Sequence, residues 1–230
     1  MRYQPFGEVI KGFPLQFDPM VALRRRGSDP SGFFGSRVSP STYRRALDEV
    51  RALVQPAFCY AVQPVLGAEP DRLLIATGQS LRSPVVAELF ASAPEVALLV
   101  YTIGPALETR VAELRQQGKH LMENLLDRLG TLALQEVGAV AYGRVEELAR
   151  EKGVRASIPL NPGTTHWPSA DQTVFEELCP LNAIGVSLTA SFFLHPLKSI
   201  SMAIALGPDV LTPDKGSSCD YCATRHLCGL

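Results

Sequence analysis

The sequence has no strong charge of either sign and no long apolar segment. Its 230 residues include 22 basic and 23 acidic side chains, which give a formal net charge of −1. Such a balance provides no general attraction to nucleic acid or to anionic membranes. The most continuous apolar run, Val96 to Ile103, is far shorter than the ~20 residues of a membrane-spanning helix. We therefore expect neither nucleic acid nor a membrane as a partner.

The motifs of several common protein classes are also missing. Gly78-Gln79-Ser80 lacks the rest of the Gly-x-Ser-x-Gly pattern of hydrolases, and it has too few glycines for a phosphate loop. No apolar stretch at the start resembles a signal peptide, so we expect a cytoplasmic protein. In a reducing compartment, the five cysteines are expected to be free, metal-bound or redox-active rather than paired in disulfides.

The remaining patterns predict a chain of alternating helices and strands with a sizeable core, since 46% of its residues are hydrophobic. Helix signals, including Ser83 as an N-cap and Gly153 as a C-cap, predict helices over 39–54, 85–91, 105–117 and 119–152. Apolar runs predict strands over 8–10, 58–65, 73–77 and 96–103. We divide the chain into an N-terminal arm, helix and strand (1–70), an α+β core (71–210) and a cysteine-rich tail (211–230).

The segment 160–168 is the first candidate for function. The turn Asn161-Pro162-Gly163-Thr164-Thr165 allows a positive φ at Gly163, and a rigid loop with free amides suits a ligand. His166 and Trp167, the only tryptophan in the chain, add a polar and an aromatic group to the loop. Trp167 either faces a ligand or fills the core, since loop aromatics do both.

The residues after the loop predict a helix and then a hairpin. Ser169 and Gln172 match a capping box, which indicates a helix start. Alternation then predicts two strands, 186–193 and 199–206, joined at His195-Pro196-Leu197-Lys198. In the second strand one face is large and apolar and the other is small. We expect a helix or a ligand to cover the small face, which consists of Ser199, Ser201, Ala203 and Ala205.

The tail contains a candidate metal site. Cys219, Cys222 and Cys228 form a Cys-x-x-Cys-x5-Cys pattern, with His226 between the last two thiols. A Cys-x-x-Cys turn directs two thiolates at one metal ion, and a third can close the site. An iron–sulfur cluster would take these three cysteines and a fourth ligand, either Cys179, a partner residue or an exogenous group. Zinc bound by the same cysteines and His226 is the alternative, and three free thiols are a third.

Several of these segments together resemble a known family. Gly163 to Pro168, the segments 184–191 and 196–201, and Tyr101-Thr102-Ile103-Gly104 with the long helix after it are similar to the reactivation domain of cobalamin-dependent methionine synthase and its stand-alone relatives. The resemblance covers roughly the last two-thirds of the chain. It implies an α+β fold in which a twisted antiparallel sheet is flanked by long helices. It also implies S-adenosylmethionine binding and a corrinoid-binding partner, whose cob(II) state is reductively methylated.

The resemblance implies a ligand site and also shows where this sequence departs from the family. In the family the ligand loop reads Arg-x-x-x-Gly-Tyr, whereas this chain has Pro159 and Thr164 at the Arg and Tyr positions, with Arg155 out of register. A guanidinium binds a carboxylate with two hydrogen bonds, and a proline cannot. An acidic residue on the long helix faces the ligand in the family, so Glu136 either faces a ligand or lies at the rim. The candidate binding residues are Asn161, Pro162, Gly163, Thr164, His166, Trp167 and Glu136.

Two hypotheses follow from these features. In the first, the protein maintains a corrinoid protein, accessory to a methyltransferase, and its tail binds an iron–sulfur cluster that delivers an electron. A cysteine-rich tail in some stand-alone relatives of the family favours the cluster. In the second, the protein is a non-catalytic binding or scaffold module with a degenerate ligand loop and a structural zinc tail.

Overall fold

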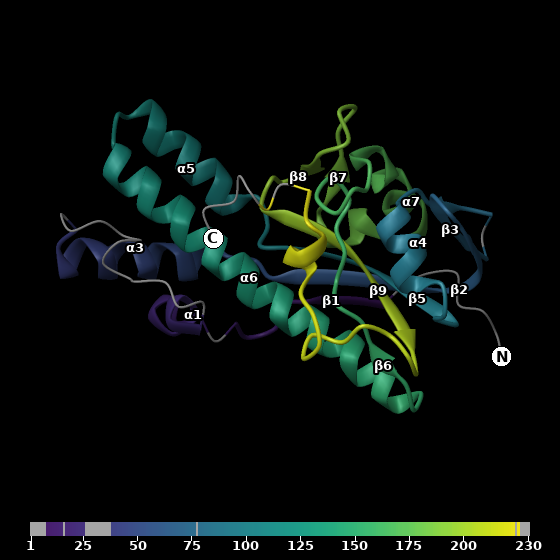
Figure 1. Ribbon diagram of the computed structural model, residues 1–230. Coiled ribbons are helices and arrows are strands. Elements are labelled where there is room, and N and C mark those ends of the chain that lie inside the picture. Colours follow the sequence, from purple (N-terminus) through teal and green to yellow (C-terminus); the bar gives the residue numbers. More distant parts are fainter. Residues whose placement is uncertain (1–7, 16, 26–37, 77, 224, 226–230) are drawn as a thin grey trace.

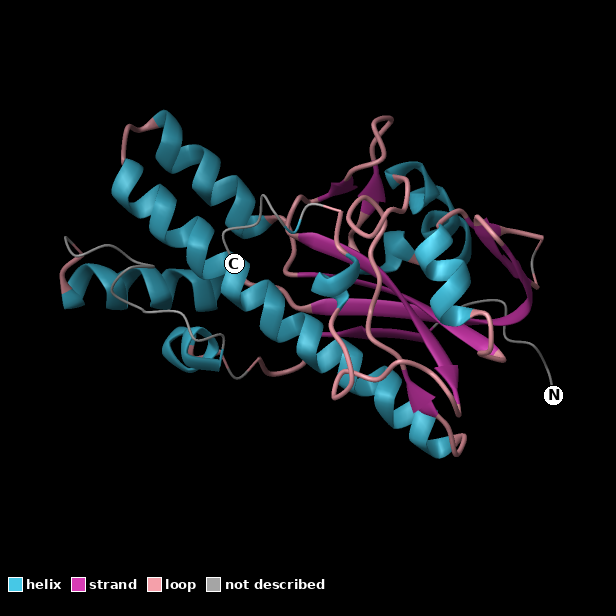
Figure 2. Cartoon of the chain, viewed as in Figure 1, coloured by secondary structure: helices cyan, strands magenta, loops and turns pink. Residues whose placement is uncertain are grey.

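The computed structural model describes residues 8–15, 17–25, 38–76, 78–223 and 225 (Figure 1). Within these residues, seven strands form one antiparallel sheet in the order β4-β3-β2-β5-β9-β6, and β1 lies beside β2. The strands are β1 (Glu8–Lys11), β2 (Ala57–Glu69), β3 (Arg72–Ile75), β4 (Ser80–Leu81), β5 (Glu95–Thr102), β6 (Arg155–Ala156) and β9 (Ser199–Gly207). The predicted class, an antiparallel sheet with long helices, is confirmed (Figure 2).

The sheet curls because β2 takes part in two stretches of pairing. Its first part pairs with β1 and β5, and its last part pairs with β3. The register shifts between Val65 and Gly67, and such an irregularity bends a strand and increases its twist.

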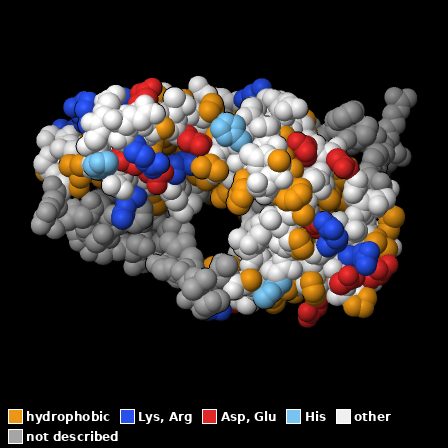
Figure 3. Space-filling model, turned by 90° about the horizontal axis from the view of Figure 1, so that it is seen from above, with side chains coloured by type: hydrophobic (Ala, Val, Ile, Leu, Met, Phe, Trp, Pro, Cys, Tyr) orange, Lys and Arg blue, Asp and Glu red, His pale blue; other side chains and the backbone are white. Residues whose placement is uncertain are grey.

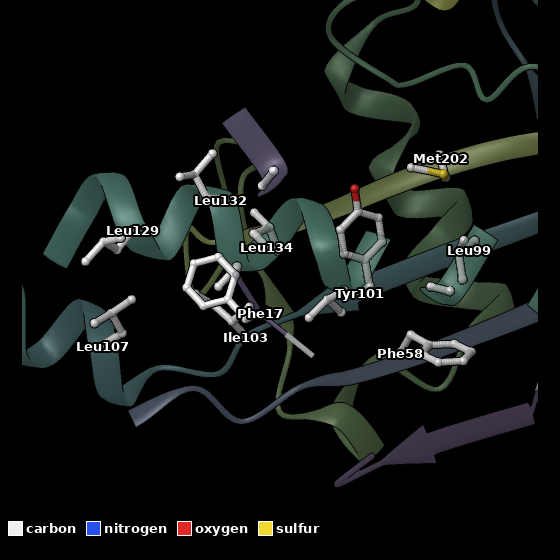
Figure 4. Packing of buried hydrophobic residues seen from close by; sticks show 14 of the residues in the cluster. Phe17, Phe58, Leu99, Tyr101, Ile103, Leu107, Leu129, Leu132, Leu134 and Met202 are labelled. Carbon is white, nitrogen blue, oxygen red and sulfur yellow. The ribbon is translucent and has the colours of Figure 1, made fainter. Parts of the chain in front are cut away.

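The central strand β5 is buried on both faces, as its continuous apolar sequence predicts. Ala97, Leu99 and Tyr101 belong to one hydrophobic cluster, whereas Val96, Leu98 and Val100 belong to the other. The first cluster also contains the buried side of α6 (His120–Glu151), and Figure 4 shows Tyr101 among those residues. The second contains Trp167 and Phe175. The loop at 160–168 and the long helix therefore pack on opposite faces of the sheet.

The helices begin and end close to their predicted positions. Ser39 and Ser83 accept hydrogen bonds from the amides of Thr42 and Val86, and each cap is followed by a proline. The helix α6 ends just before Gly153, whose φ of 72° suits a glycine after a helix end. The other α-helices are α1 (Pro19–Arg25), α3 (Pro40–Leu53), α4 (Pro84–Phe90), α5 (Ala106–Gln116) and α7 (Gln172–Leu178). Among the helices of the described ranges, none is long and apolar enough to cross a membrane.

The predicted hairpin before β9 is wrong. The segment 186–193 does not pair with β9, because β5 and the chain around β6 lie on the two sides of that strand. Instead, β7 (Ser187–Leu188) pairs with β8 (Leu194–His195) in a separate two-stranded sheet. The turn between them has Phe192 at a φ of 61° and leaves Phe193 exposed. The alternation in 186–193 therefore reflects a small projecting hairpin.

The small face of β9 is covered by a helix and the loop before it. Ala203 and Ala205 lie in the same hydrophobic cluster as Trp167 of the loop and Phe175 of α7. Ser201 Oγ donates to Gln172 Oε1 over 2.8 Å, which ties the strand to the start of α7. The expected helix over the small residues is thus present.

Candidate functional site

Several backbone amides of the loop at 160–168 donate hydrogen bonds within the loop itself. The Gly163 amide donates to the Trp167 carbonyl oxygen (2.6 Å), and the Thr164 and Thr165 amides donate to the Asn161 carbonyl oxygen (3.3 and 3.4 Å). Gly163 has a φ of 84°, as the predicted turn requires. The expectation of free amides is wrong for Gly163, Thr164 and Thr165, because all three donate within the loop.

The loop is attached to the edge of β9 that faces away from β5. Leu160 and Ala203 exchange two main-chain hydrogen bonds of 3.0 and 2.9 Å. The Asn161 side chain continues this pairing, since its Nδ2 donates to the Ser201 carbonyl oxygen over 2.8 Å. Pro162 is buried beside it. Leu160 and Asn161 therefore anchor the loop to the sheet.

Trp167 is turned into the core and hydrogen bonded there. Its side chain is 3% exposed, and Nε1 donates to Asp171 Oδ2 over 2.7 Å. The same carboxylate accepts from the Arg82 amide and from Arg82 Nε, both at 2.6 Å, and it forms an ion pair with Arg82 Nη2 at 2.6 Å. Three separate groups of donors therefore converge on one buried acid, which links the loop to the start of α4.

Neither Asp171 nor Arg82 was among the candidate residues from the sequence. An acid four residues after the only tryptophan, at the start of a helix, was the available signal for Asp171. The predicted capping box is wrong because residues 169–171 form a 3-10 turn before α7. Gln172 binds Ser201 instead of capping the helix.

His166 and Glu136 lie in different parts of the molecule. His166 is exposed and has a φ of 51°, which is unusual for a residue with a side chain. Glu136 is half-buried on α6, the helix that covers the opposite face of the sheet from Trp167. Of the candidate ligand residues on the loop, Gly163 and His166 are exposed and Asn161 and Thr164 are half-buried, whereas Pro162 and Trp167 are buried.

The tail returns to the loop. The Ala223 amide donates to the Thr164 carbonyl oxygen over 2.7 Å, which brings the residues after Cys222 against the candidate loop. Residues 218–221 form a 3-10 turn that is closed by a capping box between Ser217 and Asp220. The Cys222 amide donates to the Cys219 carbonyl oxygen over 3.4 Å, so the two cysteines flank one turn.

The predicted metal ligands are only partly within the described residues. Cys219 is exposed and Cys222 is half-buried, whereas Cys228 and His226 lie outside the described ranges. Within those ranges, no three side chains of the metal-binding types come together. Cys179, the suggested fourth ligand, is buried and donates to the Leu98 carbonyl oxygen over 3.4 Å. Its thiol is therefore held in the core.

The molecular surface has a hollow in the view from above. Figure 3 shows this hollow between two parts of the molecule, and comparison with Figure 1 places α5 on one side and the β7–β8 hairpin on the other. Exposed apolar side chains occur on both parts, including Leu121 on α6, Phe193 in the hairpin and Leu197 after it. A surface of this shape suits a large ligand or a protein partner.

No protein-family model matches the sequence, and no curated protein matches it. Among solved structures, one described as the MetH reactivation domain bound to AdoHcy matches with a TM-score of 0.62. The match covers 88% of this chain and 79% of that chain at 16% sequence identity. At this level of identity the likeness is one of fold. The chain is therefore similar in fold to the MetH reactivation domain.

Proposed function

We propose that this protein is an accessory factor that docks a corrinoid-binding protein and supports the reductive reactivation of its cob(II) state. The observation that carries the proposal is the contact between the loop and the tail, Ala223 N to Thr164 O at 2.7 Å. These two features were predicted separately from the sequence, about 60 residues apart, and they adjoin in the fold. The similarity in fold to the MetH reactivation domain supports the same proposal.

The tail suits a metal centre in the part that is described. Cys219 and Cys222 flank a hydrogen-bonded turn, the arrangement in which a Cys-x-x-Cys pair directs both thiolates to one ion. A bound iron–sulfur cluster would supply the single electron that cob(II) requires. Cys219 and Cys222 would hold that centre next to the loop, because the Ala223 amide, directly after Cys222, is hydrogen bonded to the Thr164 carbonyl oxygen.

S-adenosylmethionine does not fit this loop in the way the family resemblance implies. Pro159 stands where the family has the carboxylate-binding arginine, and the nearby Arg155 donates to the Pro208 carbonyl oxygen from Nε (3.2 Å) and Nη2 (2.6 Å). Thr164 Oγ1 donates to the Asn161 carbonyl oxygen (3.0 Å). The proposed function therefore does not include methyl transfer from S-adenosylmethionine.

The alternative function is a scaffold module with a structural zinc tail. It is favoured by the internal bonding of the loop, since three amides and the Trp167 indole are all used within the protein. In this alternative the loop carries no ligand, and zinc bound by the tail cysteines holds the tail in place.

Metal content and redox behaviour distinguish the two functions. The protein is purified anaerobically, and iron, sulfide and zinc are measured together with the visible spectrum. The proposed function predicts iron and sulfide, a chromophore that bleaches on reduction, and faster loss of the cob(II) band of a corrinoid protein. Cys222→Ala should remove the chromophore without lowering the melting temperature, whereas Ser218→Ala in the same turn should retain it.

A colourless protein with about one zinc per chain, whose tail unfolds in Cys222→Ala, would instead support the scaffold. The loop is tested separately with His166→Ala, since His166 is exposed. Binding of a cob(II) corrinoid protein should weaken in His166→Ala and stay unchanged in the control Lys215→Ala, which alters an exposed residue outside the loop. Equal affinities for both variants would remove the loop from the proposed site.

A further inference from the structure

Two cysteines far apart in the sequence meet in the core below α7. Cys59 lies within β2 and is 0% exposed, and Cys179 directly follows α7 and is 4% exposed. Both belong to one hydrophobic cluster, and interaction with Cys59 contributes, with burial, to the raised pKa of the Cys179 thiol. The Cys179 thiol also donates to the carbonyl oxygen of Leu98, which pairs with Ala61 two residues after Cys59. This hydrogen bond therefore fixes Cys179 over the part of the sheet that holds Cys59.

We propose that Cys59 and Cys179 are a site of reversible disulfide formation that locks α7 and the loop before it onto the sheet. A disulfide requires two cysteines whose side chains lie side by side, and Cys59 and Cys179 lie in one packed cluster on the same face of the sheet. The bond would join β2, beside the central strand, to the end of the helix that covers the small face of β9. The inference does not depend on the proposed function, because neither cysteine belongs to the loop or the tail.

The chemistry requires an oxidant of the small organic disulfide class. One cysteine thiolate attacks a sulfur of this disulfide, which forms a mixed disulfide and releases one organic thiol. The second cysteine thiolate then attacks the protein sulfur of the mixed disulfide, forms the Cys59–Cys179 bond and releases the second organic thiol. The protein loses two protons and two electrons in total, which together equal two hydrogen atoms, and the oxidant is reduced to two thiols.

Access to the thiols controls the rate of this reaction. Interaction with Cys59 and burial raise the pKa of the Cys179 thiol, and the thiolate is the reactive form. The reaction therefore requires a local opening of the structure. Cys179 lies at the end of a seven-residue helix, whereas β2 is paired on both sides over residues 57–60. We expect Cys179 to become accessible first.

The test uses a background in which the tail thiols are removed by Cys219→Ser, Cys222→Ser and Cys228→Ser. Of the five cysteines only Cys59 and Cys179 then remain. The folded protein is incubated with 2-hydroxyethyl disulfide, and thiol content, intact mass and cross-linked peptides are measured. The proposal predicts two thiols lost per chain, a mass lower by two hydrogen atoms and a Cys59–Cys179 peptide. The melting temperature should rise by roughly 10 °C, since the bond closes a loop of about 120 residues.

A second variant distinguishes the site from simple modification of each thiol. Cys59→Ala in the same background should give only a mixed disulfide at Cys179, with no rise in melting temperature. Mild urea should accelerate cross-linking in the two-cysteine protein if local opening limits the rate. Mixed disulfides on both cysteines without a cross-link, or a cross-link that lowers the melting temperature, would overturn the proposal.

Discussion

The replacement Asp171→Asn should loosen the candidate loop and destabilise the whole protein. The Asp171 side chain is 1% exposed, and its two oxygens accept hydrogen bonds from Arg82 and Trp167. Asparagine has nearly the same shape, but it replaces one acceptor oxygen with an NH2 group that faces existing donors. It also removes the charge opposite the Arg82 guanidinium.

The magnitude follows from the number of contacts and their exposure. Breaking a buried ion pair costs about 3–5 kcal/mol, and a buried donor left without an acceptor costs about 1–3 kcal/mol. The Arg82 side chain is 54% exposed, so water offsets part of the loss at that partner. We therefore expect the free energy of unfolding to fall by about 2–4 kcal/mol.

The assay uses the protein's own tryptophan, since Trp167 is the only one and reports directly on the loop. Urea unfolding is followed by tryptophan fluorescence and by far-ultraviolet circular dichroism. Asp171→Asn should shift the native emission to longer wavelength and lower the urea midpoint, whereas Asp209→Asn, at an exposed acid, should do neither. An unchanged emission together with a loss below about 0.5 kcal/mol would show that the network does not hold the loop.

Two further predictions concern α6. Gly138→Ala should lower the free energy of unfolding by about 1–3 kcal/mol, because the added Cβ would lie 2.6 Å from the Tyr101 hydroxyl oxygen. Gly143→Ala on the same helix meets no atom within 4 Å and should raise it by up to about 1 kcal/mol. Urea unfolding of both variants checks the pair, and a similar effect of the two substitutions would contradict the close packing against Tyr101. The Arg115 guanidinium holds the pKa of the Glu123 carboxyl below its usual value of 4.5. The stability from this pair is therefore complete above pH 4.5 and is lost as the pH falls through the lower folded-state pKa. Glu123→Gln should make stability less dependent on pH in that acid range in unfolding experiments at several pH values, and an unchanged dependence would exclude this contribution.

The division of the chain into 1–70, 71–210 and 211–230 stays a prediction, as do the tail metal and the corrinoid partner. The sequence did not decide whether the loop at 160–168 binds a ligand or packs against the core. Trp167 was equally compatible with a ligand and with the core, and the structure places its indole in the core on Asp171. The predicted positive φ at Gly163 is confirmed, but the amides of Gly163, Thr164 and Thr165 donate to carbonyl oxygens of the loop itself.

The sequence by itself determined the elements whose energies are local. The N-caps Ser39 and Ser83, the positive φ at Gly153 and the continuous apolar run of β5 each place a helix end or a buried strand correctly. These features depend on residues within a few positions of each other, so a pattern in the chain is enough to reveal them.

Only the tertiary structure decided which distant segments meet. The alternation in 186–193 predicted a partner for β9, but the places beside β9 are taken by β5 and by the chain around β6. The meeting of Asp171 with Arg82, of Cys59 with Cys179, and of the tail with Thr164 likewise joins residues that are 59 or more positions apart. Such contacts depend on how the whole sheet curls and on which segments pack on each of its faces. A pattern within a few residues of the sequence therefore does not predict them.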